Sequence, residues 1–320
     1  MKSQLKGIVF SAFIGTVAII SAQYLPHLGS ILLGLLLGMI IGNTFKISAD
    51  YLPGITYTSS KLLEFSILFL ALGINFKHIA EIGAGSFLLL TLVILLILLI
   101  SIFLARKMKQ TSTNYLVGFG TAICGSSAIA AVAPTLSKDK QETAISLAVV
   151  NLMGTLGMLL LPLILAALKT SDLRSGFIIG GSLHSVANVA GAGFSMGDEP
   201  AKIAITIKLA RVALLSPALI LYSIIIRKGE VQKLSDHFKL PWYVWSFIGI
   251  TIMTSFISIP KEVISISENT GKMVLTIAMA AIGLKVSFKS LYHSGKNAML
   301  FGALLFAIQL LLLGISSYFI

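Results

Sequence analysis

Two basic residues lie inside a long apolar segment of the chain. Residues 201–222 read AKIAITIKLARVALLSPALILY, and Lys208 and Arg211 are three positions apart, on one face of a helix. Each cation near the centre of a bilayer costs about 2.5–3.5 kcal/mol unless something compensates it. These positions lie about 10–15 Å into the segment at 1.5 Å per residue, so their side chains reach the membrane surface poorly. We therefore expect both side chains to face a polar cavity.

Acidic residues that could pair with these cations are missing from the middle of the apolar segments. Of the 12 acidic residues, all but Glu64 fall in predicted loops or at predicted helix ends. A carrier whose main cargo is Na⁺ or H⁺ usually needs carboxylates inside the membrane. The pattern therefore favours an anionic ligand that supplies the missing negative charge.

Two glycine-rich segments carry neutral hydrogen-bonding groups. They read GFGTAICGSSAIAAVAP (118–134) and GGSLHSVANVAGAGF (180–194). Small residues allow membrane helices to pack closely, but packing alone does not explain the serines, histidine and asparagine beside the glycines. Interrupted helices with exposed backbone N–H groups are typical of transporter binding sites. We predict that both segments are discontinuous helices that bind the anion.

His184 has two interpretations. His184 and Asn188 are four positions apart, on one face of a helix. Histidine titrates near neutral pH and can couple transport to protons, but it can also make a structural hydrogen bond between helices. The candidate substrate-binding residues are Cys124, Gly125, Ser126, Ser127, His184, Ser185, Asn188, Lys208 and Arg211.

The elements that must position these residues are membrane helices. Of the 320 residues, 56% are hydrophobic and 11% charged, against about a quarter charged in soluble domains. We predict an all-α polytopic membrane protein with one transporter domain (1–320), two halves (1–170 and 171–320), a polar linker (227–241) and no removed signal peptide. The eleven predicted spans lie near 7–25, 28–44, 60–76, 83–104, 115–136, 143–168, 175–196, 201–226, 242–259, 270–287 and 296–317.

The basic residues of the loops predict the orientation. With a cytoplasmic N-terminus, the inside segments hold 16 Lys and Arg residues and the outside loops hold 6, which predicts an outside C-terminus. Residues 61–79 and 272–291 resemble each other, because both end an apolar helix with a glycine followed by a Phe-Lys pair. Their opposite directions indicate an inverted repeat with crossing, discontinuous helices.

Several other classes of protein fit the sequence less well. The net charge of +12 is dispersed over short loops, which argues against nucleic-acid binding. Cys124 is the single cysteine, so an intramolecular disulfide and a multi-cysteine metal site are excluded. We expect no metal, no cofactor and no ATP-binding loop. An intramembrane hydrolase that uses Ser126 or Ser127 with His184 lacks an orienting acid and a nucleophile elbow, and an anion channel needs a continuous pore.

The motifs together resemble the YeiH-like sulfate exporter family of bacterial membrane proteins. The matching pieces are GTAICGSSAIAAVAP (120–134), TLGMLLLP (155–162), SLHSVANVAGAGF (182–194), KLARVALLSP (208–217), LGINF (72–76) and MAAIGLKVSF (279–288). The resemblance implies a multi-pass secondary transporter of the bacterial inner membrane, within the cation-antiporter and anion-transporter superfamily.

The family name implies sulfate or a sulfonate-like anion as the cargo. The spans and the inverted repeat favour an alternating-access carrier, and we expect coupling to H⁺ or Na⁺ and assembly as a homodimer. A cation- or proton-coupled carboxylate transporter is the alternative. Where family members often read His-Asp-Val-Ala-Gln, this chain has Ser185 and Asn188 after His184. The missing acid argues against proton coupling through a His-Asp pair.

Overall fold

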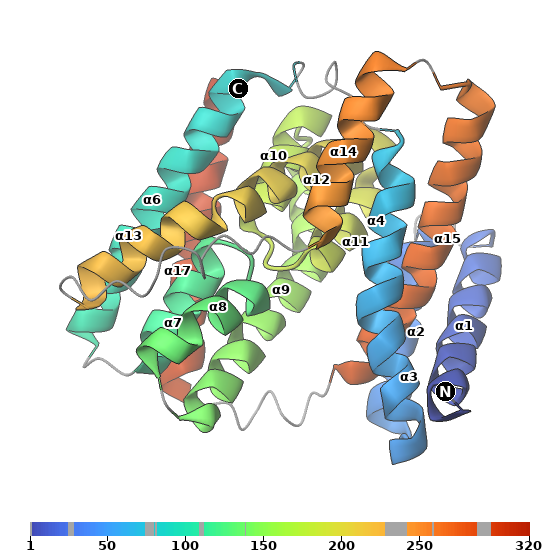
Figure 1. Cartoon of the computed structure of the whole chain (residues 1–320), viewed down its shortest axis with the longest axis horizontal. Coiled ribbons are helices and arrows are strands. Elements are labelled where there is room, and N and C mark those ends of the chain that lie inside the picture. The colour runs from blue at the N-terminus through green and yellow to red at the C-terminus, as the bar shows by residue number, and fades with distance from the viewer. Residues whose placement is uncertain are drawn as a thin grey trace. The chain divides into compact units, whose positions relative to one another are not determined.

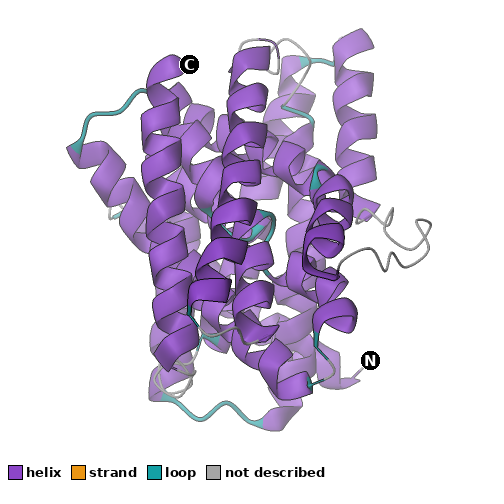
Figure 2. Cartoon of the chain, turned by 90° about the vertical axis from the view of Figure 1, so that its left-hand side faces the viewer, coloured by secondary structure: helices purple, strands orange, loops and turns teal. Residues whose placement is uncertain are grey.

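Helices are the only regular secondary structure among the residues that the structure describes. It is a computed structural model that describes residues 2–24, 29–73, 80, 82–108, 112–137, 139–227, 242–257, 259–286 and 296–320. Figure 2 shows helices joined by short loops. The predicted all-α membrane fold is confirmed.

The chain divides into two compact units, and each is built from segments far apart in the sequence. Unit 1 comprises Met1–Glu81 and Trp242–Ser290, and unit 2 comprises Ile82–Pro241 and Leu291–Ile320. The units do not coincide with the predicted halves 1–170 and 171–320, because each half contributes helices to both units.

Unit 1 is centred on its longest helix, α15. This helix packs against α1, α2 and α4, which are drawn in blue in Figure 1. Glycines permit the close approach of α2, since a Cβ added to Gly38 would lie 2.2 Å from the Ala280 carbonyl oxygen. The elements of unit 1 are α1 (Lys2–Ala22), α2 (Ser30–Thr44), η1 (Ala49–Tyr51), α3 (Leu52–Tyr57), the π-helix η2 (Thr58–Leu62), α4 (Leu63–Ala71), α14 (Trp242–Phe256) and α15 (Lys261–Lys285).

One acidic residue lies in a helix and not in the predicted loop. Glu268 lies within α15 because that helix begins at Lys261 and not near residue 270. Its side chain is half-buried. The polar residues 261–269 continue the helix beyond the segment that hydropathy marks as apolar. This correction concerns unit 1, whereas Lys208 and Arg211 belong to unit 2.

The predicted repeat is covered only in part by the described residues. The helical part of 61–79 includes α4, which packs against α15, the helix of the second copy. The Phe-Lys pairs at 76–77 and 288–289 lie outside the described residues, as does nearly all of the linker 227–241. The inverted repeat stays a prediction.

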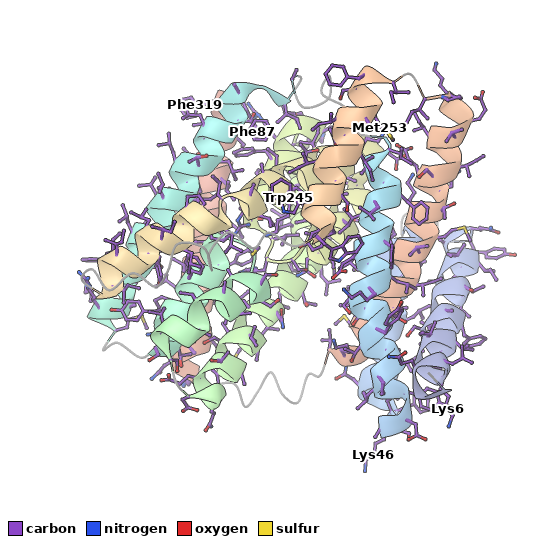
Figure 3. All side chains as sticks on the ribbon, in the orientation of Figure 1. Lys6, Lys46, Phe87, Trp245, Met253 and Phe319 are labelled. Carbon is purple, nitrogen blue, oxygen red and sulfur yellow. The ribbon has the colours of Figure 1, made fainter. Side chains whose placement is uncertain are left out.

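Lys6 and Lys46 lie at the same end of unit 1, as Figure 3 shows. The first and second predicted inside segments contain these two residues. Their placement agrees with the predicted topology of the first two spans.

Unit 2 contains the candidate functional residues. Within it, α10 and α11 pack against α12, α11 packs against α9, and α17 packs against α7. Its helices are α6 (Ala84–Lys107), α7 (Ser112–Ala122), α8 (Ser126–Leu136), α9 (Lys140–Ala167), α10 (Asp172–Ser182), α11 (Val186–Met196), α12 (Asp198–Ala213), α13 (Leu215–Arg227), α17 (Lys296–Ser316) and η4 (Ser317–Phe319).

Several helices are long and apolar enough to cross a membrane. Among the described residues these are Gln4–Ala22, Ala84–Lys107, Gln141–Ala167 and Lys296–Phe319. A fifth crossing forms if Asp198–Ala213 and Pro217–Ile226, bent by 49° at their junction, count as one. Most other predicted spans are short or broken in this structure, and the 25-residue α15 is continuous but is not among the helices that are apolar enough. The total of eleven therefore stays a prediction.

Candidate functional site

Two predicted spans of unit 2, 115–136 and 175–196, are each broken into two helices at a cluster of candidate residues. α7 ends at Ala122 and α8 begins at Ser126. The residue before α8 is Gly125, whose φ of +68° and ψ of −120° suit glycine and disfavour other residues. The predicted discontinuity of 115–136 is therefore present at its glycine and serine cluster.

The second break separates α10 from α11. α10 ends at Ser182, and the backbone is extended at Leu183 and at Ser185. The Ser185 hydroxyl accepts a hydrogen bond of 3.1 Å from the Asn188 N–H and so caps α11. Serine is a favoured cap because its oxygen satisfies a free backbone donor.

Each break leaves carbonyl oxygens without their usual helical partner. A helix end has up to four such carbonyls, and a bilayer provides no water to pair them. In unit 2 these carbonyls bind Lys208 and Arg211, both 0% exposed. The two side chains therefore do not extend to the membrane surface.

Arg211 binds the ends of both broken helices at once. Its Nε donates to the Ala122 carbonyl at 2.9 Å, and its Nη2 donates to the Thr121 carbonyl. Its Nη1 donates to the Leu183 carbonyl at 3.1 Å. The guanidinium thus joins the end of α7 to the end of α10.

Lys208 makes the same connection one turn earlier on α12. Its Nζ donates to the Leu183 carbonyl at 2.7 Å and to the Ile123 carbonyl at 3.1 Å. Close packing brings it there, since a Cβ added to Gly180 of α10 would lie 2.4 Å from the Ala204 carbonyl of α12. A positive charge is favourable at the C-terminal end of a helix, where the backbone dipole is negative.

No protein carboxylate neutralises these two cations within the described chain. None of the ion pairs among described residues includes Lys208 or Arg211. This arrangement agrees with the expectation that both cations lie in the interior without an acidic partner. Their bonds to carbonyls are an additional role that the sequence alone did not indicate.

His184 lies in the second break and keeps one ring nitrogen free. It is 1% exposed, and its Nε2 lies 3.4 Å from the Thr121 hydroxyl. Its Nδ1 has no hydrogen-bond partner among the described residues. The ring packs on Phe306 with centroids 5.2 Å apart. A buried nitrogen without a partner is costly, so Nδ1 is available to a ligand.

Gly154 of α9 provides the space that His184 and Asn188 occupy. A Cβ at Gly154 would lie 2.3 Å from the Asn188 Nδ2 and 3.2 Å from the His184 Cβ. His184 precedes α11 and Asn188 is in its first turn. The prediction that both residues share one face of a helix is therefore wrong, because His184 lies between the end of α10 and the start of α11. The structure nevertheless brings both side chains to Gly154.

The place where Lys208 and Arg211 join the α7–α8 break to the α10–α11 break is called the crossing below. The remaining candidates lie at these two breaks. Cys124 and Gly125 are buried, Ser126 and Ser185 are half-buried, and Ser127 is exposed. The Cys124 sulfur lies beside the Ser127 hydroxyl and the N–H of Ala128. The residue before α8 is Gly125, which has no side chain to cap this helix.

Sequence reasoning missed three contributors to the site. They are Thr121, which faces His184; Gly154; and Gln309, whose Nε2 donates to the Gly181 carbonyl at 3.1 Å. Gln309 could have been found as a lone polar residue in the apolar stretch LFAIQLLLL. Among the described residues, no group of three or more His, Cys, Asp or Glu side chains could hold a metal ion.

The fold and the two broken helices define a multi-pass helical membrane protein. The chain belongs to the family described as conserved hypothetical protein 698, whose model matches residues 6–302. A UPF0324 membrane protein of Oceanobacillus iheyensis is 31% identical over 304 residues, which cover 93% of this chain and 89% of the relative. A UPF0324 membrane protein of Helicobacter hepaticus is 32% identical over 325 residues, with 95% and 94% covered. The resemblance seen in the motifs is confirmed at the level of the family.

A solved structure was also matched. It is that of the sodium proton antiporter MjNhaP1 from Methanocaldococcus jannaschii at pH 8, which covers 97% of this chain and 99% of that chain. The sequence identity is 16% and the TM-score 0.30.

Proposed function

We propose that the chain is a secondary transporter of a small anion, and that the anion binds at the crossing in unit 2. The observation that carries the proposal is the pair of fully buried cations, Lys208 and Arg211, without an acidic partner among the described residues. An anion at the crossing would provide the missing negative charge. The protein acts in this proposal as a carrier and not as an enzyme, in a bacterial inner membrane.

The charges at the crossing favour a divalent anion. A helix end carries about half an elementary charge, negative at the C-terminus and positive at the N-terminus. The ends of α7 and α10 and the starts of α8 and α11 therefore roughly cancel. Protonated Lys208 and Arg211 remain, so a divalent oxyanion such as sulfate would neutralise the site.

The residues divide into two roles in this proposal. Lys208 and Arg211 hold the broken ends and supply a fixed positive field, worth about 2 kcal/mol per cation at a separation of about 8 Å and an effective dielectric constant of 20. The groups that contact the anion are the first N–H groups of α8 and α11, the neutral side chains of Ser126, Ser127 and Asn188, and the free nitrogen of His184.

A serine hydrolase is a weaker alternative. Such an enzyme needs a serine hydroxyl hydrogen-bonded to a general base. The His184 Nε2 faces the Thr121 hydroxyl, and no bond between His184 and Ser126 or Ser127 forms among the described residues. A carboxylate transporter uses the same positive site and is separated from the proposal by ligand choice alone.

Ligand-dependent thermal stability tests the proposal. The purified protein is heated with sulfate, sulfite, ethanesulfonate or acetate, each against gluconate at equal ionic strength. We expect sulfate or sulfite to raise the unfolding temperature most, since a ligand of the folded state stabilises it. Uptake or efflux of the best ligand in proteoliposomes then tests transport. The proposal fails if no anion changes the unfolding temperature, and a preference for acetate favours the carboxylate alternative.

A further inference from the structure

The polar side chain of Asn151 is exposed at membrane depth in unit 2. Asn151 is exposed on α9, and residues 141–167 of that helix are long and apolar enough to cross a bilayer. Asn151 lies about 16 Å from the start of α9 at 1.5 Å per residue, which is about half of a hydrocarbon core of about 30 Å.

The amide of Asn151 has no partner within the described chain. The hydrogen bond recorded at this residue uses its backbone carbonyl, which accepts from the Thr155 hydroxyl at 2.9 Å. Moving an unpaired amide from water into hydrocarbon costs about 2–7 kcal/mol. A position that faces lipid is therefore unfavourable, and a position that faces water or a polar ligand is not.

The surface of α9 that faces lipid lies on the other side of the helix. Leu156, Leu160 and Leu163 are 41%, 52% and 68% exposed. At about 100° per residue, Leu160 lies about 180° from Asn151 around the helix axis. The leucines and Asn151 therefore occupy separate open faces.

Among the side chains that the structure describes, those exposed on the face that carries Asn151 are small or polar. This face includes Ala144 on α9 and continues onto α8, which packs against α9, with Ser127 and Ala130. Among the described residues between Phe103 and Leu156, no large apolar side chain is exposed. α6, in contrast, exposes leucines along most of its length, such as Leu88 and Leu99.

This face is level with the crossing. Val150 packs within 3.2 Å of the Cβ position of Gly120 at the end of α7. Gly154, three positions after Asn151 and so its neighbour on the helix surface, contacts His184 and Asn188. The unpaired His184 Nδ1 lies 3.5 Å from the Cβ position of Gly154. A buried ring nitrogen without a partner therefore points toward the part of α9 that carries Asn151.

We infer that Asn151 contacts the transported anion and that Ser127, Ala130, Ala144 and Asn151 line the water-filled route to the crossing. The inference rests on the proposed function and adds a contact residue and a route to it. The Asn151 amide N–H donates to the anion, and the small side chains leave the route wide enough for it.

Cysteine labelling tests the route. Asn151→Cys and the matched control Leu160→Cys, on the lipid face of the same helix, are treated in membrane vesicles with two impermeant thiol reagents. One is an anionic ethylsulfonate methanethiosulfonate, and the other its cationic trimethylammonium analogue. The wild-type protein, whose Cys124 is buried, sets the background. We expect Asn151→Cys to be labelled several-fold faster than Leu160→Cys, and faster by the anionic reagent.

Protection of Asn151→Cys from labelling by added anions tests whether this position contacts the transported anion. Sulfate, sulfite and ethanesulfonate are each added during labelling, and the anions that stabilise the wild-type protein should slow the labelling of Asn151→Cys. Asn151→Asp, nearly identical in shape, should weaken anion binding by about tenfold or more because it places a negative charge beside the ligand.

The outcomes separate this inference from the proposed function. Labelling of Asn151→Cys no faster than that of Leu160→Cys overturns the route. Labelling that no stabilising anion slows, or unchanged binding by Asn151→Asp, overturns the contact while the transporter proposal stands. If no anion stabilises the wild-type protein, the proposed function fails, and labelling still decides whether Asn151 faces water.

Discussion

At the scale of single residues, Arg211 donates three hydrogen bonds to the backbone carbonyls of the two breaks, and Lys208 donates two. Replacement by Gln removes the positive charge and leaves the carbonyls of Thr121, Ala122 and Leu183 short of donors. Each unpaired buried group costs about 1–3 kcal/mol. We expect Arg211→Gln to lose anion binding and to unfold at a lower temperature while it still inserts into the membrane, as measured by thermal shift and by vesicle fractionation.

The matched control for Arg211 is on the same helix. Lys202→Gln removes a half-buried cation whose distance to Glu199 is 3.9 Å, and we expect wild-type binding. Arg211→Lys keeps the charge without the planar donor geometry, so intermediate binding is expected. Binding by Arg211→Gln equal to that of the wild-type protein would show that the site is assigned to the wrong residues.

Gly154 tests the neutral side of the site. A methyl group at this position would displace the Asn188 amide, which lies 2.3 Å from the added carbon. We expect Gly154→Ala to raise the dissociation constant of the anion about tenfold, equivalent to about 1.4 kcal/mol, with little loss of folded protein. Gly314→Ala on α17, where nothing lies within 4 Å, should bind normally, and equal binding by the two variants contradicts a role for Asn188.

These residues differ in how well the sequence predicts them. Lys208 and Arg211 are conspicuous because charges are rare in apolar segments. Their carbonyl partners are not predictable, because a carbonyl is free only where a helix ends. The role of Gly154 is equally difficult to predict, because the sequence NLMGTLGML does not indicate which helix packs against this glycine.

At the scale of helices, Gly125 determines where α7 gives way to α8. Its φ of +68° costs an L-residue about 1–2 kcal/mol, and an added Cβ would lie 3.0 Å from the His184 Cβ. We expect Gly125→Ala to lower the unfolding temperature and to weaken anion binding. Gly85→Ala in the first turn of α6, with nothing within 4 Å, is the control and should unfold like the wild-type protein.

The breaks themselves were predictable, and their consequence was not. Clusters of glycine with serine, histidine and asparagine mark 118–134 and 180–194 because an uninterrupted helix has no need of them. The assignment of His184 and Asn188 to one helical face fails, because a cap at Ser185 starts a new helix between them. Local cap geometry overrides the helical period at this point.

At the scale of the whole molecule, the two units could not be predicted from the order of the segments. Unit 1 takes α14 and α15 from the second half of the chain and α1 to α4 from the first. Contacts between segments nearly 200 residues apart, such as the 2.9 Å bond from the Ser267 hydroxyl to the Phe69 carbonyl, depend on packing that hydropathy does not report. The sequence predicts helices and polar sites well, and their partners poorly.

The orientation of the chain gives a prediction at the same scale. With 16 basic residues in the predicted inside segments and 6 in the outside loops, the positive-inside rule predicts a cytoplasmic N-terminus and an outside C-terminus. Alkaline phosphatase fused after Ile320 should be active and green fluorescent protein there should be dark, with the reverse for fusions after Lys107. A fluorescent C-terminal fusion means an even number of spans if an N-terminal fusion is also fluorescent, and a reversed orientation if it is dark.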